Sequence, residues 1–325
     1  MVARASRRAR LYMAGINQPT VASGVYAALL TPRRSGSIEA DASVLLDYLE
    51  TVVRAGVDGL VLFGATGEFG HFDVAERRRV VMLVIRRSRV PVLVNVSHST
   101  LAGSVDLAQN AMNAGACGLL LMPPYLYRYT EEQIFEFYQD FLKQTGGGIP
   151  IHLYNLPFFT NPLSAELAAR LLGSGAFAGI KDSSGDWQMF ESLLALRSKR
   201  AFALLAGSES LYLRGRMAGA DGIISGVAAA IPELPVAIDR AIRAHDWKRA
   251  QTLNARLGEF VERIQALPTT AGIKQAAVTR GWIPKHAAVP FDKQTVTGLA
   301  EFELWFRAWL PGVLSDCSER AAMGA

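Results

Sequence analysis

The chain has 325 residues, of which 50% are hydrophobic and 19% charged, with a formal charge of +5 and two cysteines. This apolar content can offset the chain entropy lost on folding, which excludes a disordered protein. Cys117 and Cys317 supply neither a disulfide framework nor metal-ligand spacing, so we expect a reducing, cytoplasmic compartment. The apolar runs are far shorter than the ~20 residues of a membrane-spanning helix.

The basic charge is concentrated at the N-terminus, where four arginines precede Met13 within the first ten residues. This segment lacks the apolar core of a secretory signal, so a basic tail, a transit peptide and an upstream start remain open. We expect residues 1–21 to form a poorly ordered leader and the rest of the chain to be nearly neutral. No aromatic-basic patch accompanies the charge, so nucleic-acid binding is not expected.

Eight short apolar runs alternate with longer segments of helical periodicity from about residue 24 onward. The runs are continuously apolar, which is typical of parallel strands that are covered on both faces. The predicted strands are 25–31, 59–63, 91–96, 118–122, 151–156, 178–181, 202–206 and 222–225. The helical segments between them are 42–55, 74–86, 105–114, 130–143, 165–172 and 187–197.

Eight evenly spaced strand-helix units predict a closed (β/α)8 TIM barrel over residues 22–245. An open doubly wound sheet is the alternative, and the lack of a G-x-G-x-x-G motif after the first strand disfavours it. We assign residues 246–325 to a C-terminal helical extension. From residue 232 onward the predicted helices are 235–244, 247–266, 270–280 and 297–309, with a loop at 281–293.

Lys181 has the position most typical of a catalytic group. Barrel enzymes place catalytic residues at the carboxyl ends of their strands, and Lys181 is the one lysine of seven that ends a predicted strand. If Ala178 and Ile180 face the helices, Lys181 points into the barrel mouth, where the loss of water favours a neutral, nucleophilic amine. The alternative is a structural lysine paired with Asp182.

Two further strand ends supply groups that could act with this lysine. Tyr154 ends the preceding strand, ~4.8 Å away in a sheet, and its hydroxyl could move the protons that Schiff-base formation requires. The turn Gly64-Ala-Thr-Gly-Glu68 follows the second strand and could bind a carboxylate through its backbone N–H groups and the Thr66 hydroxyl. A core tyrosine and an ordinary glycine-rich loop are the alternatives.

These segments resemble the dihydrodipicolinate synthase/N-acetylneuraminate lyase family of Schiff-base-forming class I aldolases. The resemblance extends from about residue 24 to residue 309 and implies that Lys181 forms an imine with a 2-oxo acid. It implies Tyr154 as the acid/base and Thr66 as the carboxylate-binding residue. Further substrate contacts are expected from Ala65, Gly67, Ile224, Phe159 and Ser208. The motifs that carry the resemblance are Gly64-Ala-Thr-Gly-Glu68, Pro123-Pro-Tyr125, Tyr154-Asn-Leu-Pro157, Gly179-Ile-Lys-Asp182 and Gly219-Ala-Asp-Gly-Ile-Ile-Ser225.

The same resemblance implies that the imine on Lys181 is the electron sink, so no metal and no other cofactor is expected. The five histidines agree with this, because they show no metal-binding spacing. The implied partners are a small 2-oxo acid and an aldehyde, with no membrane and no nucleic acid. The implied assembly is a homotetramer built as a dimer of dimers.

Three positions depart from the pattern of dihydrodipicolinate synthases. Ala65 replaces the first of two threonines, Leu126 stands where a tyrosine crosses the dimer interface, and Phe159 stands where an arginine binds the carboxylate of aspartate semialdehyde. Losing such an anion partner costs ~1.5–3 kcal/mol. Activity as a 4-hydroxy-tetrahydrodipicolinate synthase is therefore disfavoured unless Arg128 reaches the site, and we expect Arg128 to be a solvated loop residue.

Sialate lyases hold their sugar with an acidic pair after the seventh strand, where this chain has only Glu209. The prediction is therefore a lyase for pyruvate or a 2-keto-3-deoxy sugar acid. Phe158 and Phe159 leave an aromatic or aliphatic aldehyde open as the second substrate. The alternatives are an imine-dependent dehydratase, a catalytically silent binding barrel, and a sugar-phosphate barrel with a phosphate cup at Gly207-Ser208 and residues 222–226.

Overall fold

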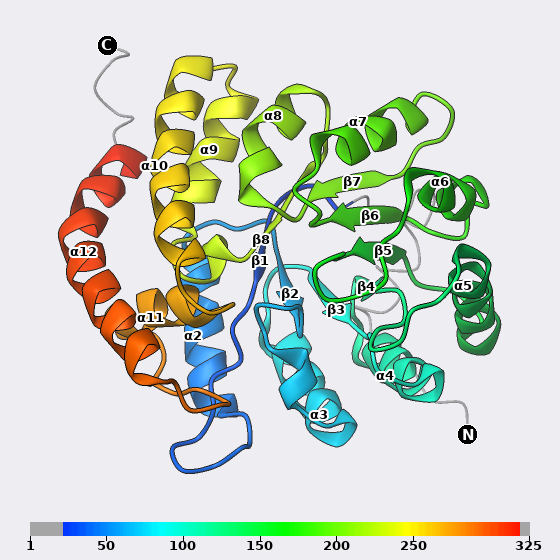
Figure 1. Ribbon diagram of the computed structural model, residues 1–325, viewed down its shortest axis with the longest axis horizontal. Coiled ribbons are helices and arrows are strands. Elements are labelled where there is room, and N and C mark those ends of the chain that lie inside the picture. The colour runs from blue at the N-terminus through cyan, green and yellow to red at the C-terminus, as the bar shows by residue number, and fades with distance from the viewer. Residues whose placement is uncertain (1–21, 319–325) are drawn as a thin grey trace, which may run out of the picture.

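The computed structural model describes residues 22–318 as a closed barrel of eight parallel strands with helices around it (Figure 1). Each strand pairs with its neighbours in chain order, and β1 pairs with β8, which closes the barrel. The predicted (β/α)8 barrel is confirmed, and the open doubly wound sheet is wrong. The strands are β1 (Gly24–Ala28), β2 (Gly59–Leu62), β3 (Val92–Asn95), β4 (Gly118–Leu121), β5 (Ile151–Asn155), β6 (Gly179–Asp182), β7 (Ala203–Ala206) and β8 (Gly222–Ser225).

Helices on the outside of the barrel connect each strand to the next. Most begin with a side-chain cap. Thr130, for example, forms a capping box with Gln133 at the start of α5. The helices of the barrel are α2 (Ala42–Arg54), α3 (Val74–Arg87), α4 (Leu101–Ala114), α5 (Glu131–Thr145), α6 (Ala165–Gly173), α7 (Trp187–Leu196), α8 (Tyr212–Met217) and α9 (Glu233–Arg243). Short 3-10 turns follow three strands, η1 (Phe69–His71), η2 (Glu209–Leu211) and η3 (Val227–Ala229).

Beyond the barrel, the extension contains α10 (Trp247–Gln265), α11 (Ala271–Thr279) and α12 (Lys293–Ser318). Figure 1 shows α10 and α12 along one side of the barrel, with α11 at the lower end of α10 and beside α12. Two sequence expectations are corrected here. Helix α8 was not predicted, because six residues containing Gly215 show no two-turn apolar pattern. Helix α12 is longer than residues 297–309, since it starts at Lys293 and continues through Pro311.

The apolar core has two layers, one between the strands and the helices and one inside the barrel. Successive side chains of a strand alternate between these layers. Ile180 lies in the outer layer, while Tyr154 and Ile224 lie in the inner one. Lys181 therefore faces the barrel interior, as the alternation predicted.

Two further expectations concern the ends of the chain and membranes. The predicted leader at residues 1–21 lies outside the described residues. Within residues 22–318, no helix combines the length and apolar character needed to cross a membrane.

Candidate active site

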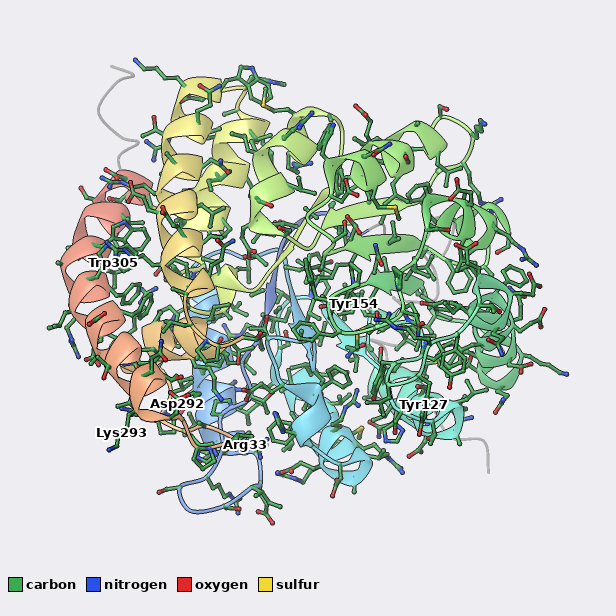
Figure 2. All side chains as sticks on the ribbon, in the orientation of Figure 1. Arg33, Tyr127, Tyr154, Asp292, Lys293 and Trp305 are labelled. Carbon is green, nitrogen blue, oxygen red and sulfur yellow. The ribbon has the colours of Figure 1, made fainter. Side chains whose placement is uncertain are left out.

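Lys181 and Tyr154 meet inside the barrel mouth. They are register partners on the adjacent strands β6 and β5, and both side chains are buried. The Nζ atom of Lys181 donates a hydrogen bond of 3.1 Å to the Tyr154 hydroxyl and lies 4.1 Å from the centre of the tyrosine ring. Figure 2 shows Tyr154 within the ring of strands. The arrangement places an amine and a proton-carrying hydroxyl where one substrate atom can touch both.

The structural alternative for Lys181, an ion pair with Asp182, is not formed within the described part of the chain. Asp182 accepts hydrogen bonds of 2.7 Å from the Asn155 amide and from the Ser184 hydroxyl. Burial raises the pKa of the Asp182 carboxyl, and these hydrogen bonds oppose that rise. The Asp182 carboxylate therefore links the ends of β5 and β6. The amine of Lys181 has Tyr154 as its hydrogen-bond partner.

The lack of a side chain at Gly207 leaves room for the side chain of Lys181. A Cβ atom at this position would lie 2.9 Å from Cε of Lys181 and 2.0 Å from Oγ of Ser183. No real Cβ makes contacts that short, so any side chain would have to displace the lysine or Ser183. The sequence suggested Gly207 only as part of a phosphate cup. Its position directly after β7 was the signal for this packing role.

The turn after β2 lies beside the end of β8. A Cβ atom at Gly226 would lie 3.0 Å from Oγ1 of Thr66, and Ala65 packs against the inner apolar layer that contains Tyr154. The Thr31 hydroxyl donates to the Gly67 carbonyl at 3.0 Å and so fixes the turn from β1. Within residues 22–318 the Thr66 hydroxyl has no hydrogen-bond partner, which leaves it free for a ligand.

The candidates after β7 are engaged with the protein. The hydroxyls of Ser208 and Ser210 are 2.8 Å apart and pair with each other. Glu209 accepts from the Ser225 hydroxyl at 2.8 Å and from the backbone N–H of Val227 at 3.2 Å. Glu209 therefore holds β8 and η3 in place. This structural contact accounts for the acidic side chain at that position.

The remaining candidates lie on exposed loops at the rim. Phe159 is 56% exposed and Phe158 is 75% exposed in the loop after β5. Leu126 is 80% exposed in the loop after β4, and Arg128 in the same loop is exposed as expected. Arg128 is thus a solvated loop residue, and both rim loops expose apolar side chains.

Asn161 joins these two rim loops, and sequence reasoning missed it. Its amide donates to the carbonyls of Pro124 at 2.7 Å and Tyr127 at 2.8 Å, and its side-chain oxygen accepts from the N–H of Tyr129 at 3.0 Å. One buried amide thus fixes the exposed apolar side chains of both loops relative to each other. An asparagine before Pro162, in a loop rather than a helix, was the available signal.

Arg77 is a second residue that the sequence did not single out. It is buried beside the ends of β2 and β3 and donates to the carbonyls of Asn95 at 2.6 Å and Ser97 at 2.9 Å. Burial lowers the pKa of its guanidinium to about 10. Burial raises the pKa of Tyr125, and the charge of Arg77 opposes that rise. A run of charges on a helix normally indicates a solvated face, which is why this arginine was missed.

No group of three or more histidine, cysteine, aspartate or glutamate side chains in residues 22–318 is arranged to hold a metal ion. The groups gathered around Lys181 and Tyr154 are an amine, hydroxyls and backbone N–H groups. These are the groups that bind and activate a carbonyl compound carrying a carboxylate.

Comparison with known proteins agrees with this arrangement. The family described as the dihydrodipicolinate synthetase family matches residues 21–303. A 4-hydroxy-tetrahydrodipicolinate synthase of Methanothrix thermoacetophila is 32% identical over 240 residues, which cover 73% of this chain and 80% of that protein.

Solved structures share the fold. YagE of E. coli K12, a dihydrodipicolinic acid synthase family protein solved with pyruvate, has a TM-score of 0.80 at 24% identity, covering 89% of this chain and 98% of that one. CdNal of Clostridium difficile, solved with mannosamine, has a TM-score of 0.80 at 19% identity, covering 89% and 100%. The chain belongs to the dihydrodipicolinate synthetase family and is a lyase of the Schiff-base-forming class I aldolase type.

Proposed function

We propose that the enzyme makes or breaks the bond at C3 of a 2-oxo acid, either pyruvate or a 2-keto-3-deoxy sugar acid, through an imine on Lys181. The observation that carries the proposal is the buried 3.1 Å contact between the Lys181 amine and the Tyr154 hydroxyl. A neutral amine adds to the C2 carbonyl, and the resulting carbinolamine loses water to form the imine. The Tyr154 hydroxyl delivers the proton that this loss of water requires.

The imine then serves as the electron sink for the chemistry at C3. In the cleavage direction, the C4 hydroxyl gives its proton to the Tyr154 oxygen, which lost one when water left the carbinolamine. The bond between C3 and C4 then breaks, its electron pair enters the imine to give an enamine, and the C4 fragment leaves as an aldehyde. Protonation of the enamine and hydrolysis of the imine release the 2-oxo acid and restore Lys181. Every step uses only this amine, proton transfers and water, so the proposal needs no metal and no other cofactor.

The carboxylate of the 2-oxo acid is proposed to bind at the turn after β2. The free Thr66 hydroxyl and the backbone N–H groups at Ala65 to Gly67 are the donors that support this. Ile224 would pack against the bound acid from β8, since it shares the inner layer with Tyr154. Ser208 and Phe159 are proposed to contact the distal part of the substrate.

The aldehyde is proposed to be neutral at the position that Phe159 faces. Phe159, Leu126 and Ala65 depart from the pattern of dihydrodipicolinate synthases, and Arg128 is exposed. Activity as a 4-hydroxy-tetrahydrodipicolinate synthase is the second candidate, because the Methanothrix relative carries that name. We also propose a homotetramer, as the family resemblance implies, while a cytoplasmic location stays a prediction.

Trapping with borohydride tests the imine directly. The protein is incubated with pyruvate and borohydride, and peptide mass spectrometry then locates the reduced adduct. We expect one adduct, on Lys181, which Lys181→Met abolishes and Tyr154→Phe slows at least tenfold. The surface variant Lys199→Met is the matched control and should label like the wild type. If the wild type gives no adduct under conditions that label another family member, the Schiff-base mechanism is wrong.

A further inference from the structure

The turn that is proposed to bind the carboxylate ends at Glu68, whose side chain reaches into the C-terminal extension. Its carboxylate accepts 2.8 Å from the Lys274 ammonium and 3.1 Å from the Thr270 hydroxyl, and both partners lie more than 200 positions later in the chain. The side chains of Lys274 and Glu68 are only 11% and 15% exposed. An ion pair so far removed from water is costly to break on one side, because the remaining charge loses its partner.

The backbone on both sides of this contact is strained. Glu68 has φ 52° and ψ 44°, and Thr270 has φ 68° and ψ −20°, conformations that residues other than glycine rarely adopt. Such conformations persist only where the surrounding structure holds them. Since the two strained residues hydrogen-bond to each other, the start of α11 and the end of the turn hold each other in place.

Helix α11 also lies near Thr66, on the other side of Gly226. A Cβ atom at Gly226 would lie 3.0 Å from Oγ1 of Thr66 and 3.2 Å from Cδ1 of Ile273. Thr66 and Ile273 therefore lie against the same backbone segment after β8. The helix thus contacts the end of the turn through Lys274 and lies close to its threonine through Ile273.

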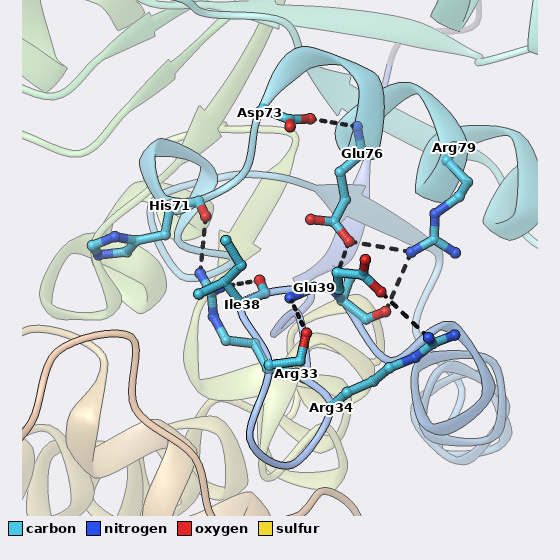
Figure 3. A network of polar contacts seen from close by, with 10 residues as sticks. Arg33, Arg34, Ile38, Glu39, His71, Asp73, Glu76 and Arg79 are labelled. Carbon is cyan, nitrogen blue, oxygen red and sulfur yellow. Dashed lines mark hydrogen bonds and ion pairs between the residues drawn. The ribbon is translucent and has the colours of Figure 1, made fainter.

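The opposite side of the turn is held by the barrel itself. The 3-10 turn η1 follows Glu68 directly, and the buried Arg33 of the β1–α2 loop donates to the carbonyls of His71, at 3.1 Å, and of Ile38. Figure 3 shows Arg33 making these two contacts beside the network of Glu39, Glu76 and Arg79. The barrel therefore supports one side of the turn, and the C-terminal extension supports the other side.

We propose that Lys274 is a positioning residue of the 2-oxo acid site. By pairing with Glu68, it lets the C-terminal extension fix the turn that presents Thr66 to the substrate carboxylate. Lys274 does not touch the reacting atoms. The inference rests on the proposed function, because it takes the turn after β2 to be the carboxylate site.

The test compares pyruvate kinetics in Lys274→Met, Lys274→Arg and Glu68→Gln. We expect Lys274→Met to raise the KM for pyruvate about tenfold or more with a much smaller change in kcat, since the turn binds the acid but does not form the imine. Lys274→Arg keeps the charge and should recover part of the loss. The double variant with Glu68→Gln should be no worse than Lys274→Met, because both substitutions remove the same ion pair.

Lys285→Met is the matched control. Lys285 is an exposed lysine beside α11 and forms no ion pair within residues 22–318, so its loss should leave KM unchanged. If Lys274→Met does not fold, Thr270→Val tests the same support through the hydroxyl alone and should raise KM in the same direction. Thermal unfolding of every variant separates a positional effect from a general loss of structure.

The concentration dependence of borohydride trapping distinguishes the two proposals. If wild-type Lys181 traps no pyruvate, the proposed function fails. If the wild type traps pyruvate and Lys274→Met reaches half-maximal labelling at the same concentration, the inference about Lys274 is wrong. A fall in kcat with an unchanged KM, or effects of the single variants that simply add in the double variant, would also overturn it.

Discussion

His152 makes stability depend on pH in a way that can be worked out from its surroundings. It lies on β5 two residues before Tyr154, so it faces the barrel interior. Its ring is buried, and within residues 22–318 neither ring nitrogen makes a well-formed hydrogen bond, although the backbone of Leu119 favours the charged form. Burial disfavours the charged imidazolium and lowers the pKa of His152 from 6.5 to about 4. The folded protein therefore keeps this imidazole neutral at a pH where the unfolded chain protonates it.

The sign and size of the effect follow from linkage. Well above pH 6.5 the imidazole is neutral in both states, so the stability it allows is fully present. As pH falls from 6.5 to 4, the unfolded chain binds a proton that the folded protein does not bind, and the free energy of unfolding decreases. With these two pKa values, the loss is about 2 kcal/mol between pH 7 and pH 5 and about 3 kcal/mol by pH 4.

Urea unfolding followed by circular dichroism at pH 7, 6 and 5 measures this loss. Asp182, whose carboxyl has a raised pKa, acts in the opposite direction because the folded state takes up its proton first. The informative quantity is therefore the difference between the wild type and His152→Leu, which cannot titrate. The variant should lose about 2 kcal/mol less than the wild type between pH 7 and pH 5. Equal pH dependence in wild type and His152→Leu would refute the reasoning.

Two substitutions test positions that border the site. Gly207→Ala should slow adduct formation on Lys181 at least tenfold and cost ~1–3 kcal/mol of stability, because its Cβ would lie 2.9 Å from the lysine Cε; adduct rates and urea unfolding measure this. Gly173→Ala, whose Cβ would meet no atom within 4 Å in residues 22–318 apart from its own helix and chain neighbours, is the control, and equal behaviour of the two would contradict the packing argument. The wild type should turn over pyruvate with aspartate semialdehyde poorly, and Phe159→Arg should raise kcat/KM for that aldehyde about tenfold or more by restoring a carboxylate partner. Efficient condensation by the wild type, measured in a coupled assay, would show that Phe159 does not select against this substrate.

Much of the fold was predictable because each strand is specified by the residues of its own short segment. The strands are continuous apolar runs, so their number and order follow from the sequence. The position of Lys181 at the end of β6 and of Tyr154 at the end of β5 follows from the same runs, since parallel strands end together at one face. Their direct register pairing needed the structure, because register depends on how neighbouring strands are offset.

The contacts that support the site were not predictable, because they join distant segments. Nothing near Glu68 in the chain indicates Lys274, and each alone is typical of a solvated charge. The same holds for Arg77, which lies in a run of three arginines on α3 but is buried at the carbonyls of β3. Whether such a side chain is buried depends on the packing of other elements around it.

The hydrogen bonds at the mouth divide its polar groups into two sets. Asp182, Glu209 and Asn161 are bonded to neighbouring strand ends and loops, so they hold the rim and cannot bind substrate without breaking those bonds. Within residues 22–318, the Thr66 hydroxyl has no partner, and the Tyr154 hydroxyl has only Lys181. Thr66 is half-buried, so a ligand can accept from its hydroxyl without breaking a hydrogen bond that holds the rim. The groups outside the rim contacts are those that a carboxylate and an adjacent carbonyl would engage, which favours a 2-oxo acid over a sugar phosphate.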